Sequence, residues 1–439
     1  MNSNLSRTAA APVASASLLR TTAISALGGV FEFYDFVIFA VFAPHIGATF
    51  FPDETGSTGA TLKAFAVFAV GYLARPIGGI LWAHVGDRRG RAYVFSHTVL
   101  GMAASTLLIG LLPGYATLGL MAPVFLVALR LLQGMALGGE IPSSLCWLSE
   151  HAGQRRRGLV TATLLAGVNS GMLLGQGVAL AIERAFGSEE SLAWAWRLAF
   201  LFGSVVGVVA YFVRRHVGET AEFTRLHAAG GVERLPLKTL IRQAPRQVVA
   251  GWCMCALHAW VVAALYLALP SYLVQVLKIP LARAESIALV SASMGSVLYI
   301  CAGWLGDRFG ARRVCVVLCI AVMLAAIPGY ALMEEVGPGA AVALGALAGL
   351  FIGAYLGLLP AMFAPAVRVS GLAVAYDGAF AVVGGLGPLV MLSAAARFGW
   401  WGPAALLALA AGVALVGLLL VGERPRAGEM AMGGLEPPT

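Results

Sequence analysis

Charged residues are scarce in this 439-residue chain. Asp, Glu, Lys and Arg make up 11% of it, whereas 59% is hydrophobic. Because soluble domains are about one quarter charged, this composition excludes an ordinary soluble domain. The 54 glycines and 20 prolines fit membrane helices, where neighbouring helices and water satisfy the backbone groups that these residues leave free. We therefore expect an all-α polytopic membrane protein.

The sequence also lacks the common motifs of catalysis and metal binding. Its six cysteines lie in apolar segments and form no C-x-x-C pair, so we expect them to be small packing residues. No zinc motif, phosphate-binding P-loop or nucleophile elbow is present. A signal peptide is an alternative for the N-terminus, but the apolar run from Thr21 to Ile46 is too long and contains two acids. We predict no enzymatic activity, no metal site and no cofactor.

Long apolar runs fill the chain. A membrane-spanning helix needs about 20 mostly apolar residues, and twelve such runs occur in two sets of six. We predict an N-terminal half over 1–213, a linker over 214–247, a C-terminal half over 248–422 and a tail over 423–439. The runs are 21–46, 60–85, 93–112, 117–148, 158–182, 193–213, 246–276, 284–305, 313–333, 338–362, 369–396 and 400–421.

The basic residues predict the orientation of these spans. Of the 29 Lys and Arg residues, 21 lie in the tails, the linker and the loops on the side shared with the termini. By the positive-inside rule, both termini are cytoplasmic. The net charge of +8 therefore indicates a topology in the lipid bilayer and no nucleic-acid partner.

A short motif occurs once in each half. "GDRRGRAYV" at 86–94 follows the second run and "GDRFGARRV" at 306–314 follows the eighth. Two related six-helix halves are a common architecture of secondary transporters. Charged residues of the cytoplasmic loops are candidates for a gate that holds the halves together: Asp87 and Arg91 in the first motif, and Glu150 and Arg157 in "SEHAGQRRRG" at 149–158. The alternative is charge that only sets topology.

Two carboxylates interrupt the first apolar run, in "FEFYDF" at 31–36. Glu32 and Asp35 share a helix face and lie 12 and 15 residues beyond Arg20, about 18–22 Å into the membrane. A carboxylate at this depth costs about 2.5–3.5 kcal/mol, so such residues face a cavity or a partner. Two acids this close do not both ionise readily. We predict that they carry a coupling proton; the alternative is permanent pairing with Arg75 or Arg130.

Arg130 lies within the fourth run, in "RLLQGMALGGE". A buried guanidinium needs an anionic partner, which is Asp35, Glu32 or a substrate carboxylate. If protonation of the acid frees Arg130, proton and anion binding are coupled; the alternative is a fixed Arg130–Asp35 pair. The glycines at 134, 138 and 139 allow close helix contact, and we expect Pro142 to break the helix. The candidate substrate-binding residues are Arg130, Gln133, Asn169, His258, Tyr355 and Asp377.

Several segments together resemble the metabolite:proton symporter family of the major facilitator superfamily. They are "FEFYDF", "ARPIGG" at 74–79, "RLLQGMALGGE" at 130–140, "EHAGQRRRG" at 150–158, "WRLAF" at 196–200, "ETAEF" at 219–223 and "LPAMFAPAVRVSG" at 359–371. The resemblance implies proton coupling at Asp35, anion binding at Arg130 and a gate at Asp87 and Arg91. Asp307 and Arg312 would repeat this gate in the second half. Asp377 departs from the family, which often has Asn there.

We therefore expect a monomeric, proton-coupled importer of a small organic anion in a bacterial inner membrane. The alternative functions are transport of a zwitterion such as betaine or proline, drug/proton antiport, and sensing at the membrane without transport. The 18 residues after Val421 contain three prolines and no heptad repeat, which argues against the long coiled-coil tail of osmosensing relatives.

Overall fold

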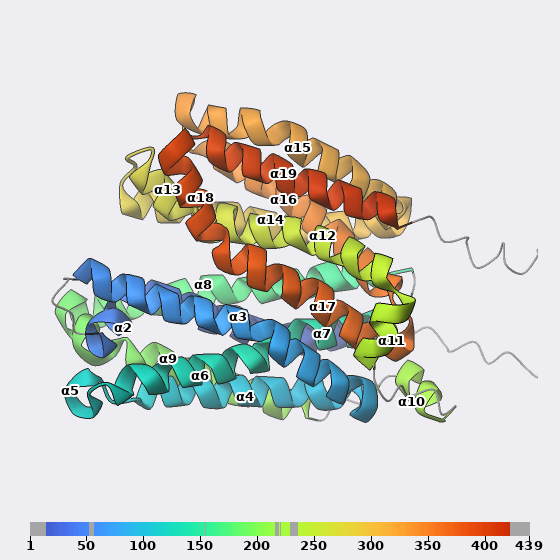
Figure 1. Ribbon diagram of the computed structural model, residues 1–439, viewed down its shortest axis with the longest axis horizontal. Coiled ribbons are helices and arrows are strands. Elements are labelled where there is room, and N and C mark those ends of the chain that lie inside the picture. The colour runs from blue at the N-terminus through green and yellow to red at the C-terminus, as the bar shows by residue number, and fades with distance from the viewer. Residues whose placement is uncertain are drawn as a thin grey trace, which may run out of the picture.

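The computed structural model describes residues 15–51, 57–153, 155–215, 219, 221–228 and 236–421. Most of these residues are helical, and short turns and loops join the helices. Figure 1 shows the helices running along the long axis of the molecule. The first part contains α1 (Ser15–Val41), α2 (Ala43–Phe50), α3 (Ser57–Arg89), α4 (Arg91–Leu111), α5 (Tyr115–Leu118), α6 (Met121–Leu137), α7 (Glu140–Ala152), α8 (Arg157–Glu190) and α9 (Arg197–Arg214).

Two short helices, α10 (Ala221–Ala228) and α11 (Pro236–Gln243), follow at one end of the molecule, which we call the linker end. The second part contains α12 (Pro245–Val261), α13 (Leu269–Gln275), α14 (Leu281–Phe309), α15 (Ala311–Glu335), α16 (Gly339–Leu358), α17 (Arg368–Ala379), α18 (Gly385–Phe398) and α19 (Trp401–Leu420). Short π-helical segments, Val262–Leu267 and Phe380–Gly384, follow α12 and α17, and 3₁₀ turns at Leu359–Met362 and Pro365–Val367 join α16 to α17.

Eleven helices in the described ranges are long and apolar enough to cross a membrane, or twelve if the bent pair α1–α2 counts as one span. This pair bends by 62° before Pro44. The sequence therefore predicts the all-α polytopic fold and the number of spans correctly. The expected break at Pro142 is wrong: α6 ends at Leu137, the break falls at Gly138 and Gly139, and Pro142 lies in the first turn of α7, where its missing N–H is not needed.

The two parts of the chain form two layers of helices in Figure 1, with α3 to α9 below and α12 to α16 above. We call the first part, α1 to α9, the first layer and the second part, α12 to α19, the second layer. Between the layers, α17 packs on α3, and α14 and α16 pack on α8. The predicted boundaries of the halves, linker and tail stay predictions, and 423–439 lies outside the described residues.

Helices α3 and α6 approach each other closely through glycine. A Cβ at Gly134 would lie 2.0 Å from the carbonyl oxygen of Gly71, and one at Gly138 would lie 2.1 Å from that of Arg75. Because only glycine fits at these contacts, the backbone of α6 lies directly against α3. This contact places the arginine of each helix in the interior of the first half.

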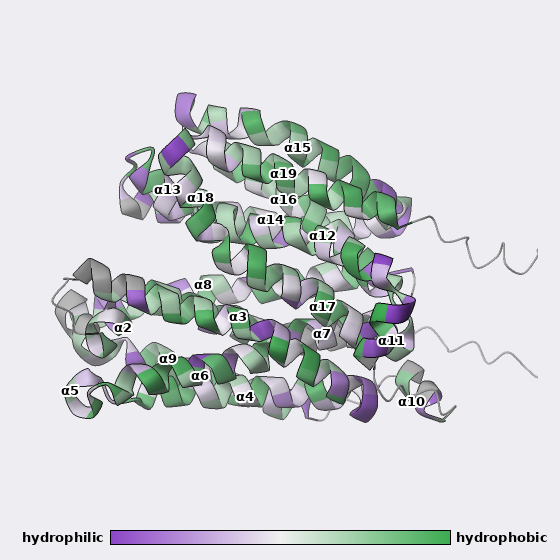
Figure 2. Cartoon of the chain, in the orientation of Figure 1, coloured by the Kyte–Doolittle hydropathy of each residue, from purple (hydrophilic) through white to green (hydrophobic). Residues whose placement is uncertain are grey.

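The outer surface is apolar, as expected for contact with lipid. Figure 2 shows hydrophobic colours along most helices and hydrophilic ones gathered around α11 and the linker end. Leu73 and Ile77 are more than half exposed on α3, whereas Arg75 between them is 2% exposed. Arg75 therefore lies inside the protein and not in the lipid.

Candidate functional site

Asp35 lies in a continuous network of polar side chains from α1, α4 and α6. Its Oδ1 accepts a hydrogen bond of 2.7 Å from the hydroxyl of Thr106, and its Oδ2 accepts one from Nε2 of Gln133. The same Nε2 lies 2.8 Å from the Thr106 hydroxyl. Oε1 of Gln133 accepts a hydrogen bond from Nη1 of Arg130. Gln133 thus connects the acid to the arginine, and all four residues are buried.

Arg130 has aromatic neighbours and one unused donor. Its guanidinium lies 4.1 Å from the ring centre of Phe39 and 5.4 Å from that of Phe68. Its buried Nε has no hydrogen-bond partner among the described residues. The direct Arg130–Asp35 ion pair considered from the sequence does not form, because Gln133 lies between the two.

A cavity of about 20 Å³, enough for about one water molecule, adjoins this network. Residues of three helices line it: Glu32, Asp35, Phe36, Gly71, Tyr72, Arg130, Gln133, Gly134 and Leu137. A carboxylate-bearing substrate needs more space, so its binding at Arg130 requires these helices to move apart.

Glu32 meets a different arginine from the one linked to Asp35. Nη2 of Arg75 lies 3.3 Å from Oε1 of Glu32 and 3.4 Å from Oδ1 of Asp377. Glu32 and Arg75 belong to the first layer, whereas Asp377 belongs to α17 of the second. These three residues, which we call the buried triad, therefore connect the two layers. Of the predicted substrate-binding residues, Asp377 binds an arginine of the protein itself.

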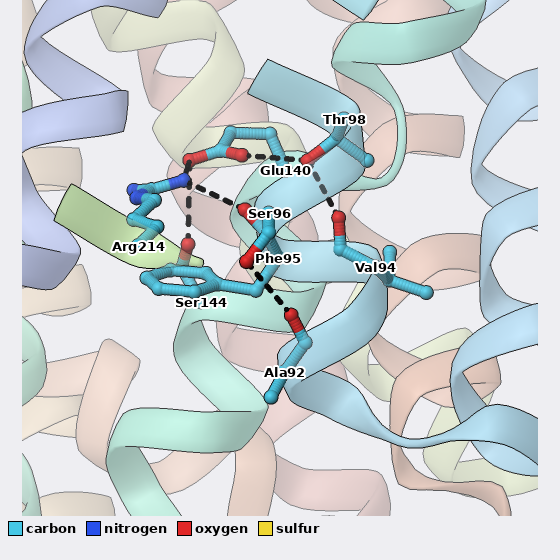
Figure 3. A network of polar contacts seen from close by, with 8 residues as sticks. All are labelled: Ala92, Val94, Phe95, Ser96, Thr98, Glu140, Ser144 and Arg214. Carbon is cyan, nitrogen blue, oxygen red and sulfur yellow. Dashed lines mark hydrogen bonds and ion pairs between the residues drawn. The ribbon is translucent and has the colours of Figure 1, made fainter. Parts of the chain in front are cut away.

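A second buried ion pair lies inside the first layer (Figure 3). Nη1 of Arg214 is 2.6 Å from Oε1 of Glu140, and both side chains are 0% exposed. The hydroxyl of Thr98 donates a 2.9 Å hydrogen bond to Oε2 of Glu140. The guanidinium of Arg214 also lies 3.8 Å from the ring centre of Phe95. This pair holds α4, α7 and α9 together.

The remaining substrate-binding candidates lie in two places. Nδ2 of Asn169 on α8 donates hydrogen bonds of 3.0 Å to Ser296 and Tyr299 of α14, so Asn169 joins the layers. His258 contacts the hydroxyl of Tyr355 through Nδ1 at 2.7 Å. The rings of Tyr376 and Phe380 also pack on His258, at centroid distances of 5.8 and 5.0 Å.

Predicted gate residues near the linker end make contacts between the layers. Oδ2 of Asp87 on α3 accepts hydrogen bonds from the hydroxyl and the N–H of Ser370 on α17, at 2.8 and 3.3 Å. Glu150 of α7 pairs with Arg368 of α17 at 2.9 Å. The carboxylate of Asp307 on α14 accepts 2.8 Å hydrogen bonds from the N–H groups of Gly158 and Leu159.

The gate has partners that the sequence motifs did not reveal. Ser370 and Arg368 carry two of the contacts, and their signal was present in "VRVSG", which the resemblance included without a role. Arg157 starts α8 beside the backbone groups that bind Asp307. Arg312 donates to the carbonyl of Leu418 at 3.2 Å, within the second layer. The side chain of Arg91 lies outside the described residues.

The comparisons with known proteins agree with this architecture. The Major Facilitator Superfamily model matches residues 25–332. The inner membrane metabolite transport protein YhjE of Escherichia coli K12 is 33% identical over 91% of this chain and 93% of its own length. The shikimate transporter of the same organism is 32% identical over 87% and 89%. A proline/betaine transporter of Salmonella typhimurium is 29% identical over 84% and 76%.

Solved structures show the same fold. The proton:xylose symporter XylE covers 92% of this chain and 95% of its own, with a TM-score of 0.75 at 15% identity. FucP, solved in the outward conformation, covers 93% and 99% with a TM-score of 0.70 at 12% identity. The relatives are those that the resemblance predicted, among metabolite and proline/betaine carriers. The chain therefore belongs to the major facilitator superfamily and is a multi-pass membrane transporter, not an enzyme.

Proposed function

We propose that this transporter imports a small organic anion together with a proton, as a monomer with both termini in the cytoplasm of a bacterium. The observation that carries the proposal is the bridge from Asp35 through Gln133 to Arg130. Because the amide of Gln133 donates to the carboxylate with one end and accepts from the arginine with the other, the charge on Asp35 determines how Arg130 is held.

Protonation of Asp35 releases this bridge. A neutral carboxylic acid is a weaker acceptor than a carboxylate, so Gln133 no longer has a charged partner and Arg130 is held less firmly. The guanidinium then has its full set of donors for the carboxylate of a substrate. Anion binding in turn favours the protonated acid, because a second negative charge beside an ionised Asp35 is repelled. Proton and anion binding therefore support each other.

The charge of the site and the named relatives support an organic anion as the substrate. A buried arginine with an unused Nε–H suits a carboxylate, and the shikimate transporter is 32% identical to this chain. A zwitterion such as betaine or proline is the second candidate, since a proline/betaine transporter is 29% identical. In that case the aromatic rings around His258 would bind the cationic group.

The test is uptake into proteoliposomes with labelled shikimate, succinate, proline and betaine, with the outside acidified and with or without a protonophore. We expect carboxylate uptake that the protonophore abolishes. Asp35→Asn should keep exchange and lose gradient-driven uptake, and Arg130→Lys should weaken binding at least about tenfold, because an ammonium cannot form the bidentate contact. The matched controls are Glu183→Gln and Arg184→Lys, at exposed positions of α8.

Undiminished gradient-driven uptake in Asp35→Asn or Arg130→Lys would remove the role proposed for that residue. Uptake of proline or betaine with no carboxylate uptake would replace the organic anion by the zwitterion.

A further inference from the structure

The buried triad of Glu32, Arg75 and Asp377 carries more negative than positive charge. Glu32 and Arg75 are 2% exposed and Asp377 is 0% exposed. Two carboxylates face one guanidinium, so the triad has a net charge of −1 when both acids are ionised. An uncompensated charge in a protein interior is strongly unfavourable and is normally removed by protonation.

The hydrogen bonding of the triad is also incomplete. Oε2 of Glu32 and Oδ2 of Asp377 have no hydrogen-bond partner among the described residues. A Cβ at Gly79 would lie 2.6 Å from this Oδ2, so the second oxygen of Asp377 lies against the backbone of α3. Ionised carboxylate oxygens that accept no hydrogen bond are costly when buried. One proton removes the excess negative charge and leaves a single ionised carboxylate in the triad, which Arg75 neutralises.

Within the part of the chain that the structure describes, no neighbouring group supplies the missing positive charge. Besides Arg75, the charged residues that act on Glu32 are Glu140 and Arg214. These two residues form an ion pair, so their charges cancel. Arg130 and Asp35 are linked to one another through Gln133. Tyr72, Tyr376 and the ring of Phe380 surround Arg75, and His258 packs behind Tyr376 and Phe380. The aromatic residues add no charge.

We infer that the buried triad is a second proton-binding site, separate from Asp35, which holds one proton while α3 and α17 are in contact and releases it when they separate. Separation removes Arg75 from Asp377 and leaves Glu32 and Arg75 as a neutral pair. Asp377 then meets water and ionises, so the proton passes to the water that enters between the two helices. With the linker end in the cytoplasm, this release is inward.

This inference goes beyond the proposed function, because it requires no particular substrate and a second proton in addition to the one on Asp35. It also assigns Asp377 to proton binding instead of substrate binding. The test needs no substrate, so its failure would leave the role of Asp35 and Arg130 standing, and their failure would not affect the triad.

The test is infrared spectroscopy of the purified full-length protein at neutral pH, in sodium-free buffer, which detects the C=O stretch of protonated carboxylic acids. We expect both Asp377→Asn and Glu32→Gln to lose the C=O band intensity of one protonated carboxyl group. In each variant the remaining acid is ionised, because it forms a neutral pair with Arg75. Asp35→Asn and the exposed control Glu183→Gln should retain it. Circular dichroism and gel filtration show which variants are folded, and either triad variant is sufficient for the test.

Unchanged intensity in a folded Asp377→Asn or Glu32→Gln protein would overturn the inference. Loss of the band from the wild-type protein on addition of sodium chloride, but not choline chloride, would overturn it as well, because the triad would then bind a metal cation in place of the proton.

Discussion

At the scale of single residues, Gly71 lies against the edge of the Arg130 guanidinium that the proposal assigns to the anion. A Cβ at this position would lie 3.4 Å from both Nε and Nη2 of Arg130 and 3.3 Å from its carbonyl oxygen. These two nitrogens form one edge of the guanidinium, of the kind that binds a carboxylate with two parallel hydrogen bonds. A methyl group at position 71 would cover that edge without a severe clash.

We therefore expect Gly71→Ala to weaken binding of the transported anion about tenfold, equivalent to about 1.4 kcal/mol, with little change in thermal stability. Measurement of KM for uptake and of the unfolding temperature checks this. Gly177→Ala, at a helical position of α8 where a Cβ meets nothing within 4 Å, is the control. An unchanged KM in Gly71→Ala would show that the anion binds elsewhere on Arg130 or not at this residue.

The ion pair between Glu140 and Arg214 belongs to the scale of secondary-structure elements, because it holds three helices together. Removal of one partner leaves a buried, unpaired charge, so we expect Glu140→Gln to lower the free energy of unfolding by about 3–5 kcal/mol. Replacing both partners, Glu140→Gln with Arg214→Met, should cost less than either change alone. Thermal unfolding in detergent measures both, with Glu183→Gln as the exposed control. Additive losses in the double variant would contradict this pairing.

A cysteine beside the contact of α7 with α17 can report whether these two helices separate. Cys146 is 0% exposed, and its Sγ lies 3.3 Å from Oε1 of Glu150, the oxygen that binds Arg368. In a protein whose other five cysteines are replaced by serine, we expect Arg368→Gln to increase the rate of Cys146 alkylation severalfold, because the helices separate more often.

Arg397→Gln, at an exposed position at the end of α18, should leave this alkylation rate unchanged. If the Arg368 variant reacts no faster than the parent protein, the ion pair does not restrain the linker end.

At the scale of the whole molecule, transport requires the two layers to move relative to each other at contacts such as that of α8 with α14. A Cβ at Gly303 would lie 2.4 Å from the carbonyl oxygen of Gly158, so a large side chain there cannot fit while the linker end is closed. We expect Gly303→Trp to abolish transport, to expose Cys146 to alkylation and to eliminate the infrared band of the triad. Gly177→Trp is the control. A fully active Gly303→Trp protein would show that closure at this contact is not part of the transport cycle.

The sequence predicted the helices well, but it did not predict which buried side chains contact one another. A run of about 20 apolar residues defines a span on its own, and a charge within it must be buried, which identified Glu32, Asp35, Arg130 and Asp377. Which arginine meets which acid depends on helix packing. Arg75 and Asp377 lie 302 positions apart, and Gln133 separates Arg130 from Asp35 only through its side-chain conformation. The break at Gly138 and Gly139 depends on close packing against α3, which composition does not show.

Helix α3 carries both Arg75, in the buried triad, and Asp87, at the linker end, and each residue binds α17. Twelve residues of continuous helix separate them by about 18 Å. Since the same two helices carry both contacts, the release of the second proton and the opening of the exit occur in a single motion. A carrier with these two contacts on separate helices would let protons slip across the membrane without cargo, and the shared helix protects the cell's proton gradient from that loss.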